Sequence, residues 1–220
     1  VPSLSSRVNI EYRKTLDVLS EVVTGPFLLS AYDFYYTDPF PKITFSELVF
    51  FDSGGYESAI EKEVEEFGLY KPDPFEWNRA KHSEAVDRFN DEIPKVIISY
   101  DHPSERMTVD KQIEHANELF RTKEGIIKEL LIKPESENSR RIKLADFFDN
   151  IESISDFDIL GFTEKELGKS ILDRMTAIAK IRQQLEEHSI EIPLHIFGSL
   201  DTITTPLYYI SGADIFDALR

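Results

Sequence analysis

The sequence contains no cysteine among its 220 residues. Disulfides, thiolate nucleophiles and metal or iron–sulfur sites built on cysteine are therefore excluded, and a metal would have to be held by histidine and carboxylate side chains. No run approaches the roughly 18 consecutive apolar residues of a membrane-spanning helix. Residues 1–13 also lack the basic and then apolar layout of a secretory signal. We therefore expect a cytoplasmic protein.

Positive charge is scarce as well. The 25 Lys and Arg residues against 41 Asp and Glu residues leave a formal net charge of −16. A chain of this sign repels phosphate backbones, so binding to a nucleic acid would need a local basic patch or a partner protein that supplies a basic surface. With 41% apolar residues, the chain has enough material for a globular core, which excludes a disordered or collagen-like protein.

Short apolar runs alternate with segments of helical period. Seven runs are apolar on both faces, which is typical of strands in a parallel sheet that is covered on both sides. These runs are residues 26–31, 47–51, 95–100, 126–132, 157–160, 193–197 and 213–216. Alternation of strand and helix, without a glycine-rich nucleotide loop, predicts an α/β protein with a (β/α)8 barrel of the TIM type. We expect one barrel domain over residues 1–220.

Two helices are predicted with particular clarity, over residues 108–121 and 165–188. Thr163 and Glu166 have the spacing of a capping box at the start of the second helix. A barrel needs an eighth strand, so either residues 8–12 form it or the chain is part of a longer, incomplete barrel. The proline-rich and tryptophan-containing stretch 70–90 is interpreted as an insertion or lid.

Reacting groups of (β/α) barrels stand at the carboxyl ends of the strands. Asp52, Asp101 and Asp217 each follow an apolar run closely. Like charges near an apolar floor raise the pKa of at least one carboxyl, which suits acid–base catalysis. Asp52 and Asp217 are therefore the candidate pair for a two-carboxylate reaction at a sugar carbon, with Asp214 as the competing acid.

The residues around these acids suggest a planar ligand rather than a metal. Asp101 could accept hydrogen bonds from two adjacent N–H groups of a base, and Tyr56 could stack on a planar ring. An ion shared with His102 or His195 is the alternative, but none of the five histidines has an HxH or HExxH spacing. No metal site is therefore predicted.

Two segments resemble motifs of one family. Residues 51–56, Phe-Asp-Ser-Gly-Gly-Tyr, resemble the DSGG[FY]Q signature of tRNA-guanine transglycosylases (queuine or archaeosine tRNA-ribosyltransferases), and residues 212–217, Gly-Ala-Asp-Ile-Phe-Asp, resemble their G-x-D-M-F-D motif. Weaker matches lie at Asp101, at residues 160–162 and at Gly198. The resemblance spans roughly residues 50–220 and includes the branch of the superfamily that modifies DNA with 7-deazaguanine bases.

The resemblance implies a base exchange in which guanine of tRNA or DNA is replaced by a 7-deazaguanine base. Asp217 would attack the ribose C1′ to form a covalent glycosyl-enzyme, and Asp52 would act as general acid and base. The residues expected to bind the substrate are Tyr56, Asp101, Gly161, Phe162, Ser53, Gly55 and Glu166. The structural alternatives are a capping role for Glu166 and core positions for Tyr56 and Phe162.

The chain also departs from the family pattern. The family's cysteine-rich zinc site is absent, so no cofactor is expected in this chain. Residues 132–135, which include Lys133, replace the segment with the base-reading Gln, and Glu57 replaces the Gln after the first motif. Base specificity is therefore expected to differ. The alternatives are hydrolysis of an N-glycoside and a noncatalytic barrel that binds a base or serves as a partner subunit.

Overall fold

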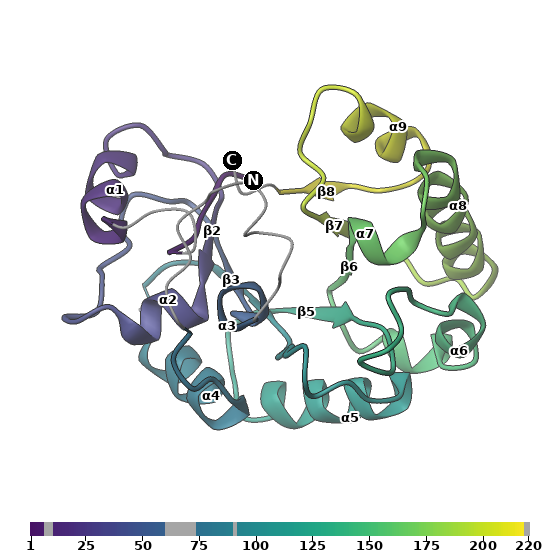
Figure 1. Ribbon diagram of the computed structural model, residues 1–220, viewed down its shortest axis with the longest axis horizontal. Helices are drawn as coiled ribbons and strands as arrows, with labels where there is room; N and C mark the ends of the chain where they lie inside the picture. The colour runs from purple at the N-terminus through teal and green to yellow at the C-terminus, as the bar shows by residue number, and fades with distance from the viewer. Residues whose placement is uncertain (7–10, 60–73, 90–91, 218–220) are drawn as a thin grey trace. The chain divides into compact units, whose positions relative to one another are not determined.

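The computed structural model describes residues 1–6, 11–59, 74–89 and 92–217. Eight strands alternate with helices along these residues, and every described strand pair is parallel (Figure 1). The chain divides into two compact units, each with four of the strands. The first unit is Pro2–Pro103, and the second is Ser104–Ala218 together with Val1. This strand–helix alternation confirms the predicted (β/α)8 class.

The first unit orders its strands along the sheet as in the sequence. Its strands are β1 (Ser3–Leu4), β2 (Phe27–Ser30), β3 (Val49–Asp52) and β4 (Lys95–Ile98), and its helices are α1 (Tyr12–Leu19), α2 (Ala31–Tyr36), α3 (Gly55–Ser58) and α4 (Arg79–Arg88). Phe51 of β3 packs edge-on against Phe34 of α2 and stacks on Phe89 at the end of α4. Buried aromatic side chains therefore fasten these helices to the sheet.

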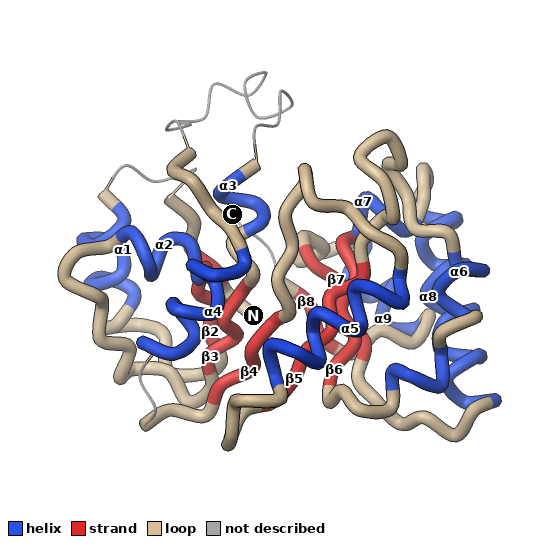
Figure 2. The backbone as a smooth tube through the Cα atoms, turned by 90° about the horizontal axis from the view of Figure 1, so that it is seen from below, coloured by secondary structure: helices blue, strands red, loops and turns tan. Residues whose placement is uncertain are grey.

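The second unit continues the same pattern. Its strands are β5 (Ile127–Ile132), β6 (Ile159–Thr163), β7 (Leu194–Phe197) and β8 (Ile215–Phe216). Its helices are α5 (Val109–Phe120), α6 (Leu144–Phe148), the 3-10 helix η2 (Ile151–Ile154), α7 (Glu164–Leu167), α8 (Ile171–Glu187) and α9 (Thr204–Ile210). In Figures 1 and 2, α6 and α8 lie on the same side of β6 and β7.

The two faces of the sheet in the second unit differ in polarity. Side chains alternate between the faces of a strand. Phe162 of β6 is fully buried and packs edge-on against Phe147 of α6, which identifies one face as the helix-covered one. On the opposite face, β5 carries Glu129 and, one residue past its end, Lys133, while β7 carries His195. This polar face holds the candidate site.

All seven predicted strands are confirmed within a few residues at their ends. The eighth strand is β1, at Ser3–Leu4, and not the predicted segment 8–12. Tyr12 begins α1, and residues 8–10 lie outside the described residues. Within the stretch 70–90, interpreted as an insertion or lid, residues 79–88 form α4, the helix between β3 and β4. Residues 70–73 and 90 lie outside the described part of the chain.

The helix predicted over residues 165–188 is divided into α7 and α8 at Gly168. A Cβ at this glycine would lie 2.5 Å from Cβ of Asp173, so only glycine lets the chain pass here. Ser170 then restarts the helix with a capping box to Asp173, whereas Thr163 makes no side-chain cap. The predicted capping box at Thr163 and Glu166 is therefore wrong, and the capping box lies one short helix later, at Ser170 and Asp173.

Within the described residues, none of the helices combines the length and the apolar character needed to cross a membrane.

Candidate active site

A lysine amine lies at the carboxyl end of β5. Lys133 Nζ donates a hydrogen bond of 2.9 Å to Thr163 Oγ1 at the end of β6, and it lies 3.0 Å from Glu166 Oε2 in α7. Arg106 Nη2 lies 3.7 Å from the other carboxylate oxygen of Glu166. The side chains of Lys133, Arg106 and Glu166 are only 12%, 12% and 14% exposed. The amine is thus held, nearly out of solvent, beside a carboxylate and a second cation.

The backbone of Lys133 is fixed from α5. The side-chain amide of Gln112 donates to the carbonyl of Lys133 at 2.9 Å and accepts from its N–H at 2.9 Å. These two bonds satisfy both peptide groups of Lys133 just where the strand ends. The position of the amine is therefore set by both a helix and a strand.

A buried chain of three ionisable groups lies on the same face of the sheet. Glu129 Oε1 of β5 lies 2.8 Å from His195 Nδ1 of β7, and His195 Nε2 lies 3.5 Å from Oδ1 of Asp217, directly after β8. Glu129 and His195 are fully buried, and Asp217 is 5% exposed. The N–H of Gly198 donates to Asp217 Oδ1 at 3.0 Å, which fixes the carboxylate from the β7 side.

The two carboxylates decide the charge of His195. Burial alone would lower the pKa of the imidazole, but the negative charge of Glu129 and the interactions with Asp217 outweigh it and raise the pKa to about 9. At neutral pH both ring nitrogens carry a proton. The three side chains therefore place one positive group, His195, between two negative ones, inside a part of the protein that excludes water.

Gly161 of β6 makes room for this chain. A Cβ at Gly161 would lie 2.8 Å from Glu129 Oε1 and 2.7 Å from Cε2 of Phe197. The ring of Phe197 stacks on the imidazole of His195 with the ring centroids 3.9 Å apart. Gly161 was expected to offer its backbone to a base, but in the structure it gives space to a carboxylate and an aromatic ring.

The first unit gathers a separate pair of buried acids. Ser6 donates to Asp33 through its N–H, at 2.8 Å, and through its hydroxyl, while Ser30 Oγ donates to Glu57 Oε2 at 2.8 Å. Burial, then the charge of Glu57, raise the pKa of Asp33 well above its usual range, although the hydrogen bonds from Ser6 oppose the shift. The sequence had suggested nothing for Asp33.

The structure brings three predicted site residues of the first unit together. A Cβ at Gly55 would lie 2.7 Å from Asp101 Oδ2, so glycine lets this carboxylate approach the turn after β3. Ser53 is buried, and its carbonyl accepts a hydrogen bond of 2.9 Å from Trp77 Nε1. Asp52 and Tyr56 are half-buried beside them. Asp217 belongs to the second unit, with Gly161, Phe162 and Glu166.

Two further predicted residues take structural or electrostatic positions. Phe162 is a core side chain against Phe147, which matches the structural alternative. Glu166 does not cap a helix through Thr163; it pairs with Lys133 and Arg106. Sequence reasoning missed Lys133 as a functional residue. The signal was present, since Glu129 and Lys133 occupy alternate positions of a strand on both sides of Leu131.

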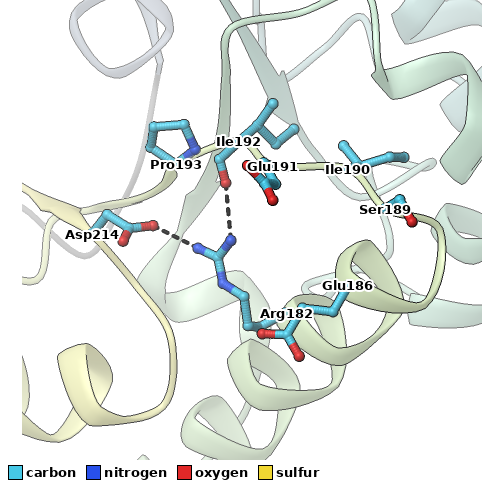
Figure 3. A pocket seen from close by; sticks show the side chains of 8 residues that line it. All are labelled: Arg182, Glu186, Ser189, Ile190, Glu191, Ile192, Pro193 and Asp214. Carbon is cyan, nitrogen blue, oxygen red and sulfur yellow. Dashed lines mark hydrogen bonds and ion pairs between the residues drawn. The ribbon is translucent and has the colours of Figure 1, made fainter.

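The competing acid Asp214 lies at the other end of the strands (Figure 3). Arg182 Nη2 of α8 donates to Asp214 Oδ2 at 2.5 Å and to the carbonyl of Gly212 at 2.7 Å, while its Nη1 donates to the carbonyl of Ile192 at 3.0 Å. Arg182, Asp214 and Ile192 line an open cavity of about 520 Å³ just before β7 and β8. Asp214 therefore ties a helix to the amino ends of two strands.

Among the residues that the structure describes, no group of three or more His, Asp or Glu side chains is arranged to hold a metal ion.

Parallel strands alternating with helices define a (β/α)8 barrel protein, and comparison with known proteins agrees with that class. No family model matches the chain, and no curated protein matches it either. Among solved structures, "QR15, an Aldolase" is similar with a TM-score of 0.55 and 12% sequence identity over 99% of this chain and 87% of that chain. At this identity the likeness shows the fold.

The expected membership of the tRNA-guanine transglycosylase superfamily is wrong. No model of that or any other family matches, and a solved structure that covers 99% of the chain is an aldolase. Base exchange through a glycosyl-enzyme on Asp217 loses its support with the family, as do the hydrolysis of an N-glycoside and a noncatalytic transglycosylase-like subunit. The nucleobase and the tRNA or DNA were inferred as partners from that family.

Proposed function

We propose that the protein is an enzyme that forms a Schiff base between Lys133 and the carbonyl group of a small substrate, and that it makes or breaks a carbon–carbon bond as an aldolase does. The placement of the Lys133 amine carries this proposal, because barrel enzymes react at the carboxyl ends of their strands. The similarity in fold to a solved aldolase supports it.

The surroundings of Lys133 suit an attacking amine. An amine attacks a carbonyl carbon only in its neutral form. Glu166 Oε2, at 3.0 Å from Nζ, is placed to take the proton, and Arg106 beside this carboxylate opposes a second positive charge nearby. Thr163 Oγ1 holds Nζ in one direction. The amine therefore has a proton acceptor, a neighbouring cation and a fixed orientation.

The reaction follows from these positions. The amine forms a C–N bond to the carbonyl carbon, the carbonyl oxygen takes up two protons and leaves as water, and a positively charged iminium remains. A base then takes the proton of the hydroxyl two carbons away, the intervening C–C bond breaks, and its electron pair moves to the iminium to give an enamine and a free carbonyl product. The protonated base then returns this proton to the enamine carbon, and hydrolysis of the iminium by water releases the second carbonyl product and Lys133.

Reductive trapping tests the proposal. The protein is incubated with pyruvate, dihydroxyacetone or acetaldehyde and sodium cyanoborohydride, and the adduct is located by intact-mass and peptide-mass measurements. We expect one adduct, on Lys133, for at least one of the three compounds, and none at this position in Lys133→Arg, which keeps the charge. Circular dichroism checks that the variant is folded.

Lys95 offers a matched control. It is also buried, at 6% exposure, but it lies at the amino end of β4, where its Nζ is 5.6 Å from the ring centroid of Phe89. Lys95→Arg should trap as much carbonyl compound as the wild type. Adducts spread over exposed lysines, with none on Lys133, would overturn the proposal.

The proposed reaction takes a small carbonyl compound as its partner. It needs no metal and no organic cofactor, because the iminium on Lys133 serves as the electron sink. The cytoplasmic location expected from the sequence stays a prediction.

A further inference from the structure

We propose that Asp217 is the group that moves the substrate proton in the second unit, and that His195 and Glu129 hold Asp217 in place and balance its charge. This inference rests on the proposed Schiff-base function, which needs a base for the hydroxyl proton and an acid for the enamine carbon. Asp217 would be the catalytic residue, and His195 and Glu129 would be positioning residues.

The register of the strands places the Glu129, His195 and Asp217 side chains on the sheet face that carries Lys133. Gly161 pairs with Leu131 on one side and with His195 on the other, and Thr163 pairs with Phe197. Since alternate residues share a face, His195 and Phe197 share a face with Thr163, whose hydroxyl accepts the hydrogen bond from Lys133. The amine and the chain of ionisable groups therefore belong to one surface of the second unit.

A purely structural role does not readily explain why Glu129, His195 and Asp217 are buried together. Burying three ionisable groups is costly, and apolar side chains of similar volume stabilise a core at least as well. Glu129 Oε2 is buried without a hydrogen-bond partner among the described residues, which costs further stability. A carboxylate kept under these conditions points to a use for its charge.

The geometry divides the roles. Of Glu129, His195 and Asp217, Asp217 alone has any exposure, and it lies at the carboxyl end of β8. When both nitrogens of His195 are protonated, the ring faces Glu129 through Nδ1 and Asp217 through Nε2. If Nε2 lost its proton, a lone pair would face the carboxylate, and Asp217 would keep the hydrogen bond from Gly198 N but lose the attraction of the imidazolium. The charged groups facing the chain are Glu129 and Asp217 around His195, and the amino group of Val1 near Asp217.

The proton transfers balance without another reactant. During cleavage the O–H bond of the substrate hydroxyl breaks and its proton moves to the carboxylate of Asp217, while the C–C electrons form the enamine. Asp217 then gives this proton to the enamine carbon and is a carboxylate again. With a donor carbonyl compound alone, the same steps remove and return a proton at the carbon next to the iminium, so that carbon exchanges hydrogen for deuterium in D2O.

Exchange measured by proton NMR separates this inference from the proposed function. Pyruvate and dihydroxyacetone are incubated with the protein in D2O, and trapping on Lys133 is measured in parallel. In Asp217→Asn we expect trapping on Lys133 to persist while exchange falls by roughly 100-fold or more, as for the loss of a general acid–base group. Asp214→Asn, on the same segment but bound to Arg182, should exchange within about threefold of the wild type.

The pH profile tests His195 and Glu129. Exchange by the wild type should decline as the pH rises through about 9, where His195 loses its proton. In Glu129→Gln the imidazolium loses its nearest negative charge, so the decline should move to lower pH by about one unit or more. A structural role alone would lower the amount of folded protein without moving this decline.

The outcomes are distinct. Absence of a Lys133 adduct in the wild type would refute the Schiff-base function. An adduct in the wild type together with normal exchange in Asp217→Asn would refute the role of Asp217 and leave the Schiff base standing. An unchanged pH profile in Glu129→Gln would refute the positioning roles of Glu129 and His195.

Discussion

A hydrogen atom in place of a methyl group at Gly161 decides how closely Glu129 and Phe197 approach His195. The ring and the carboxylate both occupy the space that a side chain of β6 would take. Phe197 covers the imidazole and Glu129 bonds to it, so neither can yield without disturbing the other. A single glycine thus permits the whole buried chain.

Replacing Gly161 with alanine should lower the free energy of unfolding by about 1–3 kcal/mol, the usual cost of overpacking a core. Urea denaturation followed by circular dichroism measures it. Gly25→Ala is the control, because nothing lies within 4 Å of its Cβ position, and it should change stability by less than about 1 kcal/mol. Equal effects of the two substitutions would show that Gly161 is not crowded.

The raised pKa of Asp33 makes the stability of the protein depend on pH. Because burial and the charge of Glu57 raise this pKa, the folded state keeps a proton that the unfolded state releases near pH 3.8. The stabilisation is complete below that pH and is lost as the pH rises through the raised pKa. In Asp33→Asn, which mimics the neutral acid, we expect a smaller loss of stability between pH 4 and pH 8 than in the wild type.

Urea midpoints at these two pH values measure the difference. Asp146→Asn is the control and should follow the wild type, because Asp146 is a half-buried acid at the start of α6 whose side chain is 35% exposed. If Asp33→Asn loses as much stability as the wild type over this interval, Asp33 is not protonated in the folded protein.

At the scale of elements, the clearest test is where α8 begins. The Ser170 side chain accepts a hydrogen bond of 3.1 Å from Asp173 N, and the Asp173 carboxylate accepts one of 3.0 Å from Ser170 N. Ser170→Ala should therefore cost about 1 kcal/mol of stability, as the loss of an N-cap does. Thr108→Ala at the start of α5 should cost less, because Thr108 makes no side-chain cap there. Thermal unfolding compares the two variants, and a reversed order would contradict this assignment of the caps.

Apolar runs predicted the strands because burial on both faces demands consecutive apolar residues. That rule failed at β1, which has only two residues, Ser3 and Leu4, and so leaves no pattern. It also failed at Gly168, where the apolar period of one helix runs on into the next although the backbone does not. Periodicity reports which face is buried, but it does not report a close approach between two backbone segments.

The candidate site was only partly predictable for a related reason. Asp101 and Asp217 were found because they follow strands, and the structure places both near the ends of β4 and β8. Glu129 and Lys133 lie within or next to an apolar run that was interpreted as a strand buried on both faces. Their alternate spacing instead marks one polar face, and only the parallel register shows that His195 shares it.

At the scale of the whole molecule, the conformation of the backbone at two turns explains why two segments resemble motifs of another family. Gly54 has a φ of 77° in the turn after β3, and Gly55 admits Asp101, so the two glycines are required by the fold. Gly212 has a φ of 108° after α9, and Asp214 binds Arg182. Short motifs at strand ends therefore arose here from turn geometry and ion pairing, on a fold that many unrelated enzymes share.

The charge of the molecule also frames its chemistry. A chain with a net charge of −16 keeps Arg106 and Lys133 within 4 Å of one carboxylate at the end of its strands. Two cations that share one carboxylate at a strand end single out this position, because exposed ion pairs contribute little to stability while part-buried ones constrain where charge lies. Lys133 is accordingly the residue on which the proposed function depends.

The measurement that tests the central claim most directly is the position of the adduct reduced by cyanoborohydride. After treatment with a small carbonyl compound and cyanoborohydride, the Schiff-base proposal predicts a single modified peptide that contains Lys133, present in Lys95→Arg and absent in Lys133→Arg. The same adduct mass in Lys133→Arg, or no modification of Lys133 in the wild type with any of the three carbonyl compounds, would contradict it.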